Sequence, residues 1–84
     1  MSRYQILGRN PAHEVIVGWD PAIKSYFGQV FDPGLDQEYN PVYTVGYQPG
    51  QIADLADLAR LMERFADIDT EMLVMLTGDR IIGR

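Results

Sequence analysis

Hydrophobic and polar residues alternate through much of the first half of the chain, and glycine, proline, asparagine and aspartate interrupt the alternation at short intervals. A period of two is typical of β-strands, and these four residue types are typical of turns. The pattern predicts four strands, at about residues 3–7, 14–19, 25–31 and 41–47. Asp20-Pro21 begins a turn between the second and third strands, which are therefore expected to form a hairpin.

The second half of the chain changes to a helical periodicity. Apolar residues between Ile52 and Ala66 fall within one arc of a helix with about 3.6 residues per turn, whereas Arg60 and Arg64 fall opposite. This predicts an amphipathic helix at about 54–66, with Asp54 as its N-cap. A second helix is expected at about 69–77, ended by Gly78.

Antiparallel strands followed by two helices predict an α+β domain in the order β-β-β-β-α-α. Because the apolar stripes of the helices must be buried, we expect both helices to pack on one face of a small, meander-like antiparallel sheet. The length of 84 residues predicts a single domain over the whole chain, 1–84.

The composition narrows the class of protein. With 46% hydrophobic and 23% charged residues, the chain is expected to fold rather than stay disordered. It has no cysteine, so neither disulfides nor thiolate zinc sites stabilise it. No apolar stretch approaches the ~18 residues of a membrane span, and the N-terminus lacks a signal-peptide core, which favours a cytoplasmic protein without membrane contact.

Acidic residues outnumber basic ones, twelve to seven, and the basic residues are not clustered. Since phosphate binding needs a basic patch, we expect no direct binding to nucleic acid. The acidic balance indicates either an ordinary solvated surface or carboxylates presented to a basic partner. On the second interpretation Asp32, Asp36 and Glu38 form an acidic patch, which Asp67, Asp69 and Glu71 would extend.

Few residues suit catalysis or ion binding. His13 is the only histidine, and a Ser/His/Asp triad would need Ser2 or Ser25 as its nucleophile. The three acids of the loop after the third strand lack the spacing of a calcium-binding loop, and no Gly-Lys-Ser/Thr sequence occurs. We therefore expect no enzymatic activity, metal or cofactor. An enzyme active site or small-ligand site built from His13, Glu14 and Asp20 is the least favoured alternative.

Both faces of the predicted strands carry apolar side chains. Val17 and Trp19 share one face of their strand while Ile16 lies on the other. Because two helices cover only one face, aromatic residues are expected either to complete the core or to meet a partner. The residues expected at a protein interface are Trp19, Tyr26, Tyr43 and Tyr47.

One sequence pattern extends over the predicted strands. Val17-Gly18-Trp19-Asp20, a turn, the aromatic pair Tyr26-Phe27 and Val30 together resemble a set of small bacterial proteins of unknown function. The resemblance extends through Tyr43-Thr44-Val45-Gly46 and the leucine-rich helix, from about residue 14 to residue 80. It implies no assigned activity and no defined active site.

These observations favour a non-enzymatic protein-interaction module that meets a protein partner or a second copy of itself as a homodimer. One alternative is an acidic inhibitor or nucleic-acid mimic from a mobile element, which would block a defence nuclease or a DNA-binding protein. The sequence does not identify the partner.

Overall fold

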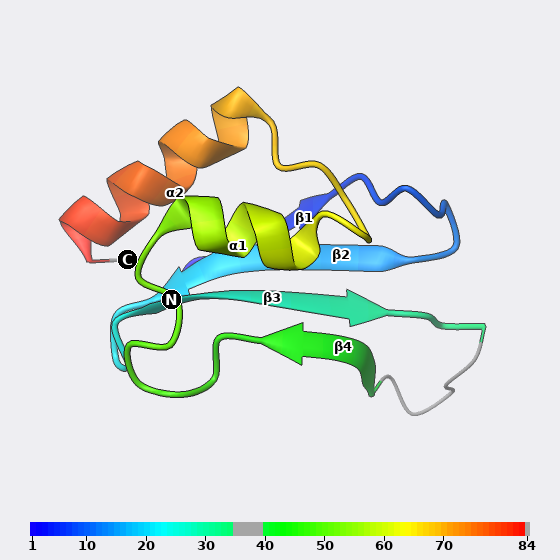
Figure 1. The fold of residues 1–84 in the computed structure, drawn as a ribbon, viewed down its shortest axis with the longest axis horizontal. Helices are drawn as coiled ribbons and strands as arrows, with labels where there is room; N and C mark the ends of the chain where they lie inside the picture. The colour runs from blue at the N-terminus through cyan, green and yellow to red at the C-terminus, as the bar shows by residue number, and fades with distance from the viewer. Residues whose placement is uncertain (35–39, 84) are drawn as a thin grey trace.

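A computed structural model describes residues 1–34 and 40–83 of the chain. Four antiparallel strands are followed by two helices, which confirms the predicted α+β class (Figure 1). The strands are β1 (Tyr4–Ile6), β2 (Glu14–Asp20), β3 (Ser25–Phe31) and β4 (Pro41–Val45). The helices are α1 (Leu55–Met62) and α2 (Thr70–Ile82).

The strands lie in the sheet in the order β1-β2-β3-β4, so each one pairs with its neighbour in the sequence. The β2–β3 hairpin is the longest pairing, and its register sets Val15 opposite Val30 and Trp19 opposite Tyr26. The register between β3 and β4 shifts at Val30 and Phe31, which marks a β-bulge. Regular pairing therefore weakens toward the end of β3.

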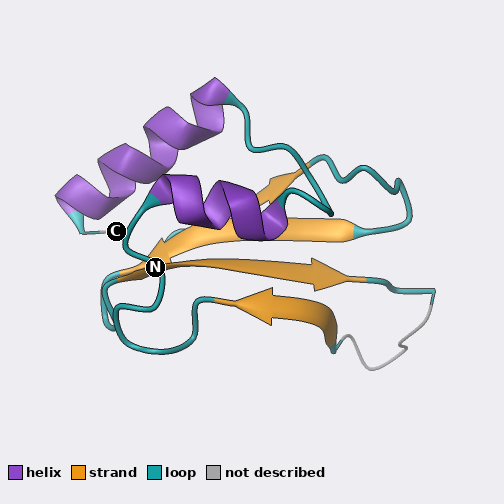
Figure 2. Cartoon of the chain, in the orientation of Figure 1, coloured by secondary structure: helices purple, strands orange, loops and turns teal. Residues whose placement is uncertain are grey.

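The core lies between the sheet and the helices, which Figure 2 shows together on one side of the sheet. Side chains from the strands and from both helices form one buried cluster: Val15, Val17, Trp19, Tyr26, Val30, Ile52, Leu58, Met62, Ala66 and Leu76. Gly28 lies opposite Val17 on the same face. A β-carbon added at Gly28 would lie 2.4 Å from the Met62 Sδ, so the missing side chain lets α1 pack closely on β3.

Helix α1 ends at Met62, four residues before the predicted end at 66. The helix does not continue here because Arg9, from the loop after β1, donates hydrogen bonds to backbone carbonyl groups that follow Met62. Its Nε donates to the Glu63 carbonyl oxygen at 2.7 Å, and its backbone N–H donates to the Phe65 carbonyl oxygen at 2.8 Å. A distant segment thus supplies the hydrogen bonds that further helical turns would have made.

Helix α2 continues past Gly78, so the predicted end of this helix was wrong. Glycine inside a helix costs about 1 kcal/mol relative to alanine, but buried Leu76 and Asp79 anchor the turns on both sides of it. The helix ends at Ile82, and Gly83 caps it in the left-handed conformation with φ of 84°. Ile81 and Ile82 therefore belong to the helix.

Strand β4 ends at Val45 rather than at residue 47, because Gly46 turns the chain with φ of 89°. The following loop then runs beside the β2–β3 hairpin. The Tyr26 N–H donates to the Ile52 carbonyl oxygen at 3.0 Å, and the Ile52 N–H donates to the Ser25 Oγ at 3.0 Å. These bonds fix the entry to α1 against the start of β3.

Candidate interaction surface

The structure buries two of the four aromatic residues predicted at an interface. Trp19 is 4% exposed and Tyr26 is 2% exposed, and their ring centroids lie 4.8 Å apart. The expectation that these rings lie on an exposed strand face was wrong. Both side chains point to the helix side of the sheet, where they complete the core.

The other two aromatic residues lie on different surfaces. Tyr43 is half-buried against Phe65, with 4.7 Å between ring centroids, and its hydroxyl donates to the Leu61 carbonyl oxygen at 3.1 Å. Tyr47 is about half exposed, and its hydroxyl accepts a hydrogen bond from the Gln29 side chain on the opposite face of the sheet. The structure therefore does not bring the four residues together.

The sheet face away from the helices is only partly apolar. Phe27 is buried there, since its ring lies against Gly18 and leaves no room for a β-carbon at that position. Gln29 lies nearby and accepts a 2.8 Å hydrogen bond from the Arg3 guanidinium. Polar contacts thus occupy part of the sheet face that we expected to bind a partner.

His13 and Asp20, of the least favoured alternative, lie at opposite ends of β2. His13 precedes β2 and Asp20 ends it, so a strand of 7 residues, roughly 20 Å long, separates them. The His13 Nε2 lies 3.5 Å from a carboxylate oxygen of Asp32, whereas Asp20 accepts the Ala22 N–H within the hairpin turn at 3.0 Å. Each side chain has a local structural contact, and no shared site results.

Three of the predicted acidic residues are engaged in separate local contacts. Asp32 accepts the Gly34 N–H at 3.1 Å, Asp67 pairs with Arg9, and Asp69 accepts the Met72 N–H at 2.8 Å as the N-cap of α2. Glu71 lies exposed in the first turn of α2. The predicted patch residues Asp36 and Glu38 lie outside the described residues. Within residues 1–34 and 40–83, no three His, Asp or Glu side chains are grouped as metal ligands would be.

Helix α2 has apolar side chains on its outer side as well as its inner side. Leu76 is fully buried beneath the helix, yet Val74 is 66% exposed, Ile81 80% and Ile82 65%. Their spacing of seven and eight residues places them on one side of the helix, together with Met75. We call Val74, Met75, Ile81 and Ile82 the α2 stripe.

Gly78 lies in the middle of the α2 stripe. A β-carbon added there would meet nothing within 4 Å, apart from the helix's own backbone. Packing within the described chain therefore gives no steric reason for glycine at this position, and glycine weakens a helix. The sequence signal for this surface is that apolar residues occur on all sides of α2. A predicted helix that ends before Gly78 leaves out Ile81 and Ile82, so it does not reveal this surface.

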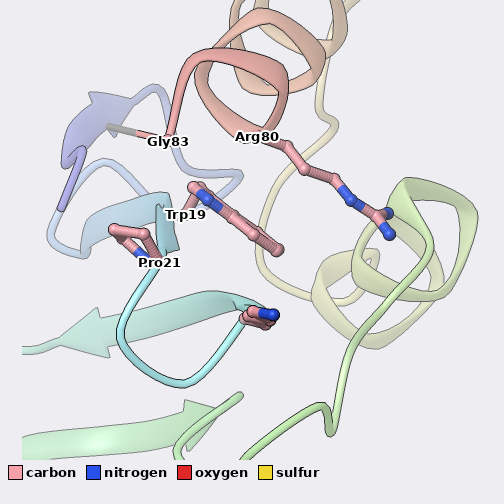
Figure 3. Close-up of a pocket in the computed structure, with 5 residues that line it drawn as sticks. Trp19, Pro21, Arg80 and Gly83 are labelled. Carbon is pink, nitrogen blue, oxygen red and sulfur yellow. The ribbon is translucent and has the colours of Figure 1, made fainter.

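A cavity of about 300 Å³ opens beside the C-terminal end of α2 (Figure 3). It is lined by Trp19, Pro21, Lys24, Arg80 and Gly83. These residues come from the β2–β3 hairpin and from the C-terminal end of α2 with its cap, so segments far apart in the sequence form the cavity. We call it the Trp19 cavity.

No protein-family model matches the chain, and no curated protein or solved structure is detectably similar to it. Among the described residues, no helix has the length and apolar character needed to cross a membrane.

Proposed function

We propose that this protein is a non-enzymatic protein-interaction module that self-associates through the α2 stripe. The observation that carries the proposal is the exposure of Val74, Ile81 and Ile82 along one side of a helix whose other side is already buried. Removing apolar surface from water is worth about 25 cal/mol per Å², so a continuous exposed stripe favours docking.

A second copy of the chain fits the stripe because the stripe is self-complementary. If two α2 helices cross in antiparallel orientation at Gly78, residues at equal distances before and after it face each other. Val74 then meets Ile82 of the second copy, and Met75 meets Ile81. Antiparallel helices also place opposite dipole ends together. The absence of a side chain at Gly78 allows the helix axes to approach closely at the crossing.

The size of the surface predicts a weak dimer. Helix α2 has 13 residues and is therefore about 20 Å long. One face of such a helix supplies less than the ~800 Å² per partner of a standard interface. We expect a dissociation constant on the order of micromolar or weaker, so the dimer fraction should rise with protein concentration.

The test is the solution mass, measured by sedimentation or light scattering at several protein concentrations. The mass should rise from 9.5 kDa toward twice that value. Ile81→Lys places a charge in the stripe and should keep the protein monomeric at all concentrations. Ala56→Lys adds the same charge to an exposed position on α1 and should leave association unchanged. A wild-type protein that stays monomeric, or equal effects of both variants, would disprove the proposal.

A further inference from the structure

Two cationic side chains, neither of them paired with a carboxylate of the described residues, line the Trp19 cavity. Lys24 comes from the β2–β3 turn. Arg80 comes from the last turns of α2, as Figure 3 shows. In the part of the chain that the structure describes, Arg9 and Arg60 form ion pairs with aspartates, whereas Lys24 and Arg80, like Arg3 and Arg64, do not. Of these four cations, only Lys24 and Arg80 line this cavity. In a chain with five more acidic than basic residues, two unpaired cations at one cavity mark a local positive site.

The Trp19 side chain, which lines the same cavity, carries a buried hydrogen-bond donor. The Trp19 Nε1 is enclosed and has no acceptor among the described residues, although Trp19 itself forms part of the cavity wall. A buried donor without a partner costs about 1–3 kcal/mol, so such groups are rare in folded proteins. Because Nε1 is enclosed, it is not itself a contact for a ligand; the Trp19 ring contributes to the cavity as part of its wall.

The backbone at Lys24 gives a third indication. Lys24 has φ of 50°, the only positive value at a described residue other than glycine. The left-handed conformation costs an L-residue roughly 1–2 kcal/mol, and glycine or asparagine adopts it more easily. The backbone conformation of the turn therefore does not itself favour lysine.

We propose that the Trp19 cavity binds a small anion that carries a carboxylate or phosphate group. Lys24 supplies a mobile positive charge, while Arg80 is held in place by its hydrogen bond to the Ala53 carbonyl oxygen. The Arg80 guanidinium also lies over the Trp19 ring, 5.4 Å from its centroid, which fixes the orientation of its remaining N–H groups. The negative end of the α2 dipole opposes anion binding, but it amounts to about half a charge against two full positive charges.

Trp19 is the only tryptophan, so its fluorescence and its indole N–H resonance report on this cavity alone. The probes are acetate, benzoate and inorganic phosphate, each titrated at constant ionic strength with chloride as the balancing anion. We expect a saturable change with acetate and benzoate if the group is a carboxylate, and with phosphate if it is a phosphate. A change that does not saturate, or that chloride reproduces, would overturn the proposal.

Variants separate binding from folding. Lys24→Asn removes the charge but suits the left-handed backbone, so affinity should fall at least tenfold while the melting temperature stays equal or rises. Lys24→Arg should restore binding. Arg60→Gln removes the same charge from an exposed residue outside the cavity lining, and affinity should change less than twofold. Unchanged affinity in Lys24→Asn, or equal loss in Lys24→Asn and Arg60→Gln, contradicts the site. These outcomes do not depend on self-association.

Discussion

The phenolic hydroxyl of Tyr4 donates a 2.6 Å hydrogen bond to a carboxylate oxygen of Asp79, and this bond joins the first strand to the last helix. Asp79 is only 4% exposed, and it belongs to none of the ion pairs among the described residues. A buried carboxylate needs hydrogen-bond donors to replace its lost hydration. The contact therefore helps to hold α2 against β1.

Tyr4→Phe should lower the free energy of unfolding by about 1–3 kcal/mol, because it leaves the buried Asp79 carboxylate without this donor. Urea denaturation measures the change. Tyr47→Phe is the matched control, since it removes a hydroxyl that contacts Gln29 at an exposed position, and its effect should stay within about 0.5 kcal/mol. Equal effects of the two variants would show that the Tyr4 hydroxyl contributes no special stability.

Gly28→Ala should destabilise the fold by about 1–3 kcal/mol, because the new β-carbon would crowd the Met62 Sδ at 2.4 Å. Chemical denaturation of a double-mutant cycle tests the cause. In a Met62→Ala background the space is free, so the added methyl group should cost little. If Gly28→Ala costs the same in both backgrounds, the contact with α1 is not the reason for the glycine.

Gly46→Ala should be strongly destabilising. The β-carbon would lie 2.1 Å from the Tyr26 carbonyl oxygen and 2.6 Å from the Phe27 Cα, and backbone atoms cannot move aside as a flexible side chain can. We expect a loss of at least about 3 kcal/mol in a thermal or urea melt. Gly50→Ala is the control with positive φ but open space, and it should cost only about 1 kcal/mol.

Gly78→Ala should move two properties in opposite directions. At low concentration the melting temperature should rise, because alanine favours the helix by about 1 kcal/mol and the methyl group meets nothing in the described chain. At high concentration the dimer fraction should fall, because the methyl group separates the two helices at their crossing. Sedimentation and thermal melts of the same samples measure both. A higher melting temperature with an unchanged dimer fraction would place the interface elsewhere.

The order of the elements follows from local sequence signals, which explains why it was predictable. The Asp20-Pro21 turn and the alternation on both sides of it define the β2–β3 hairpin without distant contacts. The end of α1 was not predictable, because Arg9 caps it from the other end of the chain. Gly78 was ambiguous for a related reason, since a glycine ends a helix or continues it according to the packing of its neighbours.

The site residues were harder to predict than the fold. The alternation of residues correctly placed Trp19 and Val17 on one face of β2. It does not indicate which face of the sheet the helices cover, so the predicted aromatic interface was placed on the face that the helices bury. The Trp19 cavity was not predictable from local patterns, because its lining residues, such as Lys24 and Arg80, are about sixty residues apart in the sequence. The acidic residues were visible, but their hydrogen-bond partners depend on the folded loops.

The sequential strand order also has a kinetic consequence. Every strand pairs with its neighbour along the chain, so each hairpin closes only a short loop before its hydrogen bonds form. Such a sheet should assemble quickly, hairpin by hairpin, whereas the Tyr4–Asp79 contact spans 75 residues. Substitutions in the β2–β3 hairpin should therefore slow refolding, and Tyr4→Phe should chiefly speed unfolding.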